Sequence, residues 1–293
     1  MRRIGVIGLG LLGGAVASRL LRGGLEVAGH DVRPEAVDAL RAQGLRPAAS
    51  VAEAAAGADA VITILPTLES VEAVWLGPGG LVETAPRQAR LLQMSTISQA
   101  LTLRLAGAAA ARGLAFLDTP MSGTSGMVAR GDCTIFAGGA AADVEACRPA
   151  FDAIAKKTLH IGPVGAATLA KLATNMLVGL HTAALAEALV LGAKGGLAPA
   201  ALVEIFRESA AGSRMVEVRG PLMAERRFAP QMKLELFLKD FKLMLEEGQH
   251  LGVALPLTSL THQLCTATVA AGRGGEDLAA LITTLERLAG LDA

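Results

Sequence analysis

The chain has 293 residues, enough for one large domain or two of ordinary size. Its 27 Lys and Arg residues balance 27 Asp and Glu residues, which argues against general binding to nucleic acid. Hydrophobic residues make up 52% and charged residues only 18%, so the chain has ample material for a core and does not resemble a disordered one. There is no tyrosine, which excludes every oxidoreductase class that donates its proton from a Tyr hydroxyl.

Cysteine and histidine are too sparse to suggest a disulfide framework or a metal centre. The three cysteines lie far apart and the five histidines occur singly, so we expect no metal and a reducing, cytoplasmic location. Met1-Arg2-Arg3 and the apolar run behind them mimic a signal peptide or membrane helix. That run is shorter than the ~20 residues a span needs, and its glycines fall where a strand turns into a helix. We therefore expect no membrane association.

The first half of the chain alternates between apolar runs typical of buried strands and helical patterns. Strands are expected at 3–8, 26–30, near 45, and at 59–65, 89–95, 114–121, 133–139 and 157–161. Helices are expected at 12–22, 34–43, 50–57, 69–75, 98–111 and 141–154, with a loop over 122–131. This alternation predicts an α/β domain with a Rossmann-type, doubly wound sheet over residues 1–163.

Strand signals largely disappear in the second half. Helices are expected at 166–194, 198–210, 213–224, 234–251, 256–271 and 275–289. The first of these would be roughly 43 Å long at about 1.5 Å per residue, which suggests a helix shared by two domains. We therefore predict an all-α domain over residues 164–293, joined to the first by this long helix.

A glycine-rich turn follows the first predicted strand and opens the first predicted helix. It is the GxGxxG pattern Gly8-Leu9-Gly10-Leu11-Leu12-Gly13. Gly8 permits the tight turn, Gly10 lets the backbone approach a pyrophosphate, and Gly13 allows the helix to pack closely on the strand. In this context the pattern predicts a dinucleotide site, with the helix N-terminus facing the phosphates.

The end of the second predicted strand bears on the choice of cofactor. Asp31 stands 18 residues after Gly13, where a carboxylate accepts hydrogen bonds from the adenine ribose and repels a 2′-phosphate. Its alternative role is that of a solvated strand-end or capping residue. Arg33 is placed to meet a 2′-phosphate, or is a plain surface arginine. The sequence predicts NAD as the cofactor, with NADP as the alternative.

Lys171 and Asn175 share one face of the long predicted helix, since they are four residues apart. An amine on such an apolar stripe is either a surface group with its charge in solvent or a buried functional one. Burial would lower its pKa from about 10.4 toward working pH, where a lysine can pass a proton to a carbonyl oxygen. Ser122, Gly123 and Thr124 form a small-residue turn that offers N–H groups and hydroxyls to a carboxylate, or is a plain loop.

Together these segments resemble the β-hydroxyacid dehydrogenase family, which includes 3-hydroxyisobutyrate dehydrogenase and tartronate semialdehyde reductase. The motifs are the glycine-rich turn, Asp118 to Thr124, Gly165 to Asn175, and Lys239-Asp240, in that order and across the whole chain. The family's usual pattern at this turn is Ser-Gly-Gly, and this chain has Thr124 in place of the second glycine. A side chain at this position leaves the size of the substrate in question.

The resemblance implies a function and a set of site residues. The reaction is hydride transfer between NAD(H) and a short 3-hydroxy acid or its semialdehyde, with Lys171 as general acid and base. Asn175 would bond Lys171 or the substrate oxygen, and Ser122, Gly123 and Thr124 would hold the substrate carboxylate. Lys239 and Asp240 match the pair that closes over the nicotinamide, and Leu65, Pro66 and Thr96 match positions lining the cofactor.

Three alternatives remain open. An imine reductase of the same superfamily usually lacks the lysine, and a non-catalytic NAD-binding protein would be expected to have lost it. Hydroxyacyl-CoA dehydrogenases need a His–Glu pair, and neither His160 nor His181 has an obvious motif partner. The helical half has few charges, so we also expect burial against a second subunit in a homodimer or homotetramer.

Overall fold

The computed structural model describes residues 1–291 and forms two compact units, Met1–Lys171 and Leu172–Ala293. The division falls inside one long helix, α10 (Ala166–Lys194). The predicted domain boundary, after residue 163, lies just before that helix. Each unit is described by itself.

The first unit is built on a sheet whose first six strands run in the order β3-β2-β1-β4-β5-β6, all parallel. This is the doubly wound order typical of dinucleotide-binding folds. The strands are β1 (Arg3–Ile7), β2 (Glu26–His30), β3 (Arg46–Pro47), β4 (Ala60–Thr63), β5 (Arg90–Gln93), β6 (Ala115–Asp118), β7 (Met121–Ser122), β8 (Thr134–Gly138) and β9 (Lys157–Gly162). Beyond β6 the sheet is mixed, because β8 runs antiparallel to both β6 and β7 and parallel to β9.

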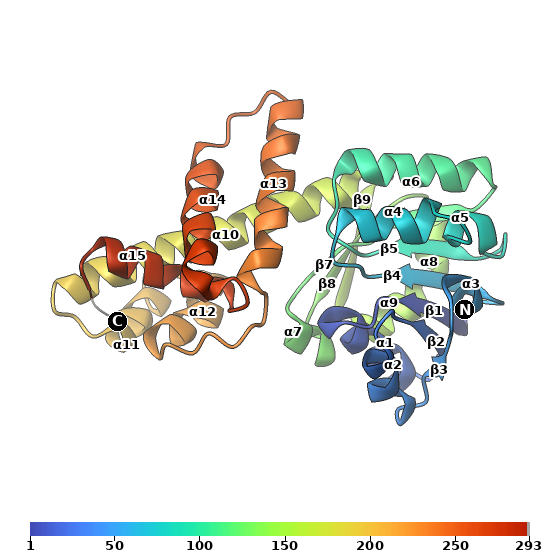
Figure 1. Ribbon diagram of the computed structural model, residues 1–293, viewed down its shortest axis with the longest axis horizontal. Coiled ribbons are helices and arrows are strands. Elements are labelled where there is room, and N and C mark those ends of the chain that lie inside the picture. Colours follow the sequence, from blue (N-terminus) through green and yellow to red (C-terminus); the bar gives the residue numbers. More distant parts are fainter. Residues whose placement is uncertain (292–293) are drawn as a thin grey trace. The chain divides into compact units, whose positions relative to one another are not determined.

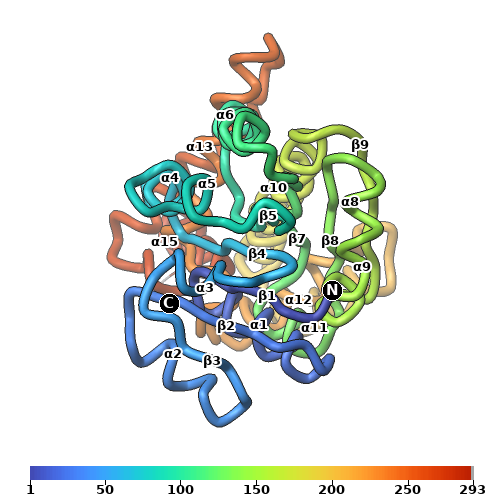
Figure 2. Tube along the Cα trace, turned by 90° about the vertical axis from the view of Figure 1, so that its right-hand side faces the viewer, coloured from blue at the N-terminus to red at the C-terminus, as the bar shows by residue number. Residues whose placement is uncertain are grey.

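Helices cover both faces of this sheet, as Figures 1 and 2 show. They are α1 (Leu11–Arg22), α2 (Pro34–Arg41), α3 (Val51–Ala55), α4 (Leu68–Leu76), α5 (Leu81–Thr84), α6 (Gln99–Ala111), α7 (Ser125–Ala129), α8 (Ala141–Ala146) and α9 (Arg148–Ile154). Successive strand residues point to opposite faces, so Ile62 packs in a cluster with α1, α2 and α9, and Val61 in another with α3, α4 and α6. The predicted Rossmann-type sheet is confirmed.

Proline explains two differences from the predicted elements. The strand expected over 114–121 is two strands, β6 and β7, separated by Thr119 and Pro120, and Pro120 has no N–H for a ladder. The helix expected over 141–154 is broken at Cys147, because Pro149 cannot donate to the preceding turn. The loop predicted over 122–131 is also wrong in part, because it contains α7.

The regular elements described in the second unit are all helical. Besides α10 it contains α11 (Pro199–Arg207), α12 (Arg214–Ala224), α13 (Leu234–His250), α14 (Pro256–Thr268) and α15 (Ile282–Leu288). The helix expected over 256–271 ends earlier, where a π-turn (Val269–Arg273) includes Gly272 at φ +85°. The helix expected over 275–289 begins later, with a 3-10 turn (Leu278–Leu281) that the Asp277 side chain caps.

A buried ion pair organises the segment before α13. Asp277 is fully buried and its carboxylate lies 3.2 Å from Arg219 Nε on α12. It also accepts hydrogen bonds from the backbone N–H groups of Gln231, Met232 and Ala279, each at 3.0 Å. Since nearly every oxygen lone pair has a donor, the charge is compensated inside the core. Nothing in the sequence pattern singled out this pair.

The helix α10 is long and apolar enough to cross a membrane by length and composition alone. Core helices of water-soluble proteins pass the same test. Here the apolar residues Leu185, Ala186, Leu189 and Val190 are buried in a cluster with side chains of α11 and α12. Packing inside the second unit therefore accounts for the apolar character of this part of the helix.

Candidate active site

The glycine-rich turn joins β1 to α1 at the carboxyl edge of the sheet. Gly8 has φ +91°, and a Cβ there would lie 2.1 Å from the Ile64 carbonyl oxygen. A Cβ on Gly13 would lie 1.9 Å from the Gly8 carbonyl oxygen. Gly10, the N-cap of α1, has only the Arg33 side chain within 4 Å of a Cβ position, at 3.6 Å. The turn is thus tightly packed behind and open at the helix N-terminus, which fits a pyrophosphate.

The carboxylate of Asp31 is tied to this turn and to Arg33. Asp31 accepts hydrogen bonds from the backbone N–H of Leu9 at 2.7 Å and of Arg33 at 2.9 Å, and Arg33 Nε lies 3.2 Å away. Burial raises the pKa of Asp31, but these hydrogen bonds and the Arg33 charge outweigh it and hold the pKa below its usual value. The Arg33 guanidinium is therefore already paired with a carboxylate, although its side chain is 55% exposed.

Leu65, Pro66 and Thr96 follow β4 and β5, two strands that neighbour one another in the parallel sheet. The backbone N–H of Leu65 donates to Ser95 Oγ at 2.9 Å. Gln93, fully buried, donates from Nε2 to the Ser95 carbonyl at 2.8 Å. These bonds hold both chain segments at the edge where β1 ends in the glycine-rich turn. Sequence reasoning missed Gln93 and Ser95, because a lone Gln and Ser in a strand carry no motif.

The turn Ser122-Gly123-Thr124 leads from β7 into α7. Gly123 has φ +151°, and a Cβ there would lie 2.9 Å from Cys133 Cβ. Thr124 is the N-cap of α7, with its Oγ1 accepting from Met127 N at 3.3 Å. The departure from the family's Ser-Gly-Gly therefore has a local structural role. The Thr124 hydroxyl accepts a hydrogen bond at the N-terminus of α7, and a glycine has no side chain that could do so.

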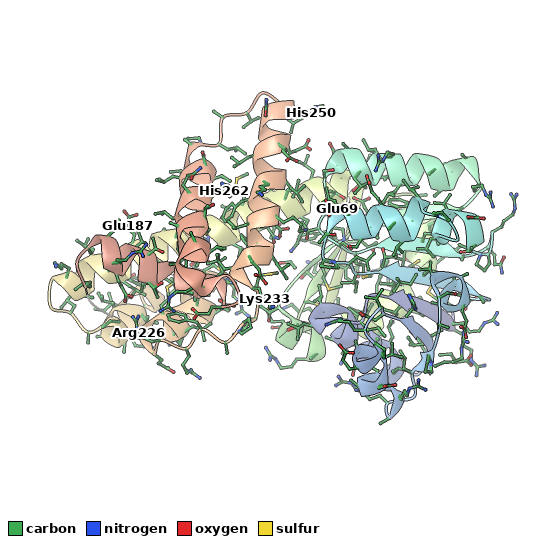
Figure 3. The ribbon with its side chains drawn as sticks, in the orientation of Figure 1. Glu69, Glu187, Arg226, Lys233, His250 and His262 are labelled. Atoms are coloured by element: carbon green, nitrogen blue, oxygen red, sulfur yellow. The ribbon has the colours of Figure 1, made fainter. Side chains whose placement is uncertain are left out.

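Lys171 and Asn175 lie one turn apart on α10. Both are buried, with 8% and 4% of their surface exposed. The alternative of a surface lysine with its charge in solvent is excluded by this burial. Glu187, farther along the same helix, is exposed (Figure 3) and lies in a different environment.

Asp240 joins two of the predicted site residues in the second unit. Asn175 Nδ2 on α10 donates to Asp240 Oδ2 at 2.7 Å. Lys239 Nζ lies 3.1 Å from Asp240 Oδ1, and Asp240 is only 4% exposed. A buried carboxylate with a cation on one oxygen and an amide on the other is a rigid, oriented group. The structure thus brings Asn175 together with Lys239 and Asp240, although Asn175 lies 65 residues before Asp240 in the sequence.

Other titratable groups do not gather into a second centre. Within residues 1–291 no group of three or more His, Cys, Asp or Glu side chains is arranged to hold a metal ion. The three cysteines are buried thiols, and burial raises the pKa of Cys133 to about 11 and that of Cys147 and Cys265 to about 12. His250 and His262 lie on separate helices, α13 and α14 (Figure 3).

Both halves of the chain match models of known protein families. Residues 3–162 match the family described as the NAD binding domain of 6-phosphogluconate dehydrogenase. Residues 165–285 match the family described as NAD-binding of NADP-dependent 3-hydroxyisobutyrate dehydrogenase. The chain belongs to the β-hydroxyacid dehydrogenase family. It is an NAD(P)-binding oxidoreductase of the hydroxyacid dehydrogenase type.

Relatives match over almost the whole length of the chain. 2-(Hydroxymethyl)glutarate dehydrogenase of Eubacterium barkeri is 35% identical over 99% of this chain and 96% of its own. The crystal structure of 3-hydroxyisobutyrate dehydrogenase from Salmonella typhimurium is 31% identical, with a TM-score of 0.88 over 97% of this chain and 99% of that one. An imine reductase from Streptomyces aurantiacus is 20% identical with a TM-score of 0.67 and shows the fold alone, over 97% of this chain and 99% of that one.

Proposed function

We propose that this protein oxidises a short 3-hydroxy acid to its semialdehyde, or reduces the semialdehyde, with Lys171 as general acid and base. The substrate would be of the 3-hydroxyisobutyrate or tartronate semialdehyde/glycerate type. The observation that carries the proposal is the burial of Lys171 on α10, one turn before Asn175, in a chain that has no tyrosine. The names of the two hydroxyacid dehydrogenases above support it, because both contain a 3-hydroxy carboxylate.

The nicotinamide, when bound, supplies the hydride acceptor or donor. In the oxidation direction the amine of Lys171 takes the proton from the substrate hydroxyl as the C–H bond breaks. In reduction the same group, as an ammonium, returns a proton to the carbonyl oxygen. Asn175, oriented by its hydrogen bond to Asp240, binds the amine or the substrate oxygen.

The remaining site residues hold the two ends of the reactants. Ser122, Gly123 and Thr124 present backbone N–H groups and hydroxyls to the substrate carboxylate. In the first unit, Leu65, Pro66 and Thr96 line the cofactor. In the second unit, Asp240, fixed by Lys239, orients the substrate, and Lys239 binds the cofactor. Each of these assignments follows from a motif position that the family shares.

The cofactor preferred by the site is NAD. The Asp31 carboxylate faces the glycine-rich turn, where it accepts hydrogen bonds from the ribose hydroxyls and repels a 2′-phosphate. Arg33, a cation beside this position, is already paired with Asp31. Both features disfavour NADP.

The function is tested by replacing Lys171 with Ala and assaying a panel of hydroxy acids with NAD. The panel contains 3-hydroxyisobutyrate, glycerate, threonate, 4-hydroxybutyrate and serine. We expect turnover of every substrate accepted by the wild type to fall by about 10²–10⁴-fold, the usual contribution of a general acid or base. Lys194→Ala, at the exposed end of the same helix, is the matched control and should keep full activity. Unchanged turnover in Lys171→Ala overturns the assignment, and a protein that binds NADH but oxidises no hydroxy acid supports the non-catalytic alternative.

We further propose that the second unit assembles into a homodimer or homotetramer. Large apolar side chains on its helices are exposed, among them Leu177 (54%), Leu191 (76%), Leu257 (64%) and Leu260 (61%). Where such side chains form one continuous patch, they are characteristic of a surface that binds another protein. A monomeric mass in light scattering at micromolar concentration contradicts this proposal.

A further inference from the structure

We propose that Asp118 is a positioning residue that fixes Lys171 relative to the turn Ser122–Thr124. This inference rests on the proposed function, since it concerns the same lysine. Asp118 is the last residue of β6, and its side chain is completely buried. A buried carboxylate lowers the stability of the fold unless hydrogen-bond donors surround it. The donors to Asp118 therefore show which segment its side chain holds in place.

Three hydrogen-bond donors to Asp118 lie in the first turn of α10 or in the residue directly before it. Asp118 Oδ1 accepts from the backbone N–H of Gly165 at 3.0 Å. Asp118 Oδ2 accepts from the backbone N–H of Thr168 at 2.8 Å and from the Thr168 hydroxyl at 3.0 Å. The first turn of a helix leaves its N–H groups without partners inside the helix. Asp118 therefore supplies, from a strand, the cap that α10 lacks in its own sequence, and its negative charge suits the helix N-terminus.

The backbone around Asp118 is shaped to admit this contact. Gly138 pairs with Asp118 across the antiparallel β6–β8 ladder, and a Cβ on Gly138 would lie 2.3 Å from Asp118 Oδ1. Gly165 has φ +92°, a conformation that presents its N–H to the carboxylate and that other residues adopt only with strain. Two glycines are thus required for one carboxylate to meet one helix end.

The contact joins two segments of the proposed site. Lys171 follows Thr168 by three residues, a rise of about 4.5 Å along the helix. Ser122 follows Asp118 by four residues, beyond Pro120. Both segments lie in the first unit, so the bonds of Asp118 determine where the Lys171 amine stands relative to the turn that binds the substrate carboxylate. A shift of about 1 Å in such an alignment lowers turnover by about 10²-fold.

The test is the pair Asp118→Asn and Lys171→Ala with their double variant, assayed in the full-length protein. The Asn amide group would place its own N–H donors against the N–H of Gly165 or Thr168, so the start of α10 should shift. Asp118→Asn should therefore lower kcat per NADH-binding site by about 10²-fold. The KM for NAD and the affinity for NADH should not change, because the glycine-rich turn is untouched. In the Lys171→Ala background, Asp118→Asn should cause no further loss, because its effect acts through the lysine.

Asp59→Asn is the matched control. Asp59 also accepts hydrogen bonds from two backbone N–H groups, those of Arg2 and Arg3. It directly precedes β4, however, so it lies at the amino-terminal ends of the strands, whereas Asp118 lies at a carboxyl-terminal end. Its turnover should equal that of the wild type. If Asp118→Asn lowers activity equally with and without Lys171, or if its kcat per binding site is normal, the positioning role is refuted while the proposed function stands. If Lys171→Ala is itself active, the proposed function fails instead.

Discussion

Replacing Asp31 with Asn should reverse the choice between NAD and NADP. The carboxylate has two roles, because it holds the glycine-rich turn through Leu9 N at 2.7 Å and neutralises Arg33 at 3.2 Å. Asn keeps an oxygen that accepts from Leu9 N, so the turn should retain its shape. What is lost is the negative charge, and with it both the repulsion of a 2′-phosphate and the restraint on Arg33.

The size of the change follows from two contributions. Loss of charge-assisted hydrogen bonds to the ribose weakens NAD by about 1.5–3 kcal/mol, or roughly 10–100-fold. Two unit charges about 5 Å apart repel by about 3 kcal/mol at an effective dielectric constant of about 20. Because the Arg33 side chain is 55% exposed, solvent screening reduces the gain for NADP to about 1 kcal/mol, or roughly 5-fold. The ratio of kcat/KM for NAD over NADP should therefore fall by about 10²–10³-fold.

Steady-state kinetics with both cofactors measure this ratio. Asp38→Asn removes an exposed carboxylate from α2, where it pairs with Arg41, and should leave the ratio unchanged. Adding Arg33→Ala to Asp31→Asn should remove the gain for NADP. A wild-type ratio in Asp31→Asn would refute the reasoning, and so would a wild-type enzyme that prefers NADP, since Arg33 would then outweigh Asp31.

Three further predictions concern stability. Arg219→Met should lower the free energy of unfolding, measured with urea, by about 3–5 kcal/mol, because it leaves the buried Asp277 carboxylate without its counter-charge. Arg226→Met is the control, because solvent screens the partly exposed pair of Arg226 with Glu286. It should lower the free energy of unfolding by at most about 1 kcal/mol. Thr124→Ala should cost about 1 kcal/mol through loss of the α7 cap, and Thr124→Gly less, as thermal unfolding would show; equal stability of all three would contradict the capping role. Burial in the folded state raises the thiol pKa values to about 11 and about 12, so their contribution to stability is complete below the unfolded pKa of about 8.5 and is lost progressively as pH rises from there toward the folded values. Urea midpoints should therefore fall between pH 8 and pH 10, and less so in a variant with all three cysteines replaced by Ala.

Much of the fold was predictable because its signals are local. The order of strands and helices in the first unit follows from hydrophobic periodicity, and α10 was predicted at its observed bounds, 166–194. The glycine-rich turn, Asp31 and the segment Ser122–Thr124 were predicted as site residues because each combines a residue type with a fixed position beside an element. The prediction for Lys171 depended on the resemblance to the family. Prolines and glycines inside predicted elements caused most of the errors, since one missing N–H or one positive φ ends a helix or strand without altering the pattern around it.

The sequence by itself determined the doubly wound sheet, the helical second half, and the residue types available for chemistry, including the absence of tyrosine on which the proposal of a lysine proton donor rests. Tertiary structure alone decided which of these groups meet. Asp118 and Thr168 are fifty residues apart, and Arg219 and Asp277 fifty-eight, yet each pair is hydrogen-bonded and buried. The physical reason is that a buried charge requires partners, and those partners come from whichever segments the fold places beside it, at distances no local pattern encodes.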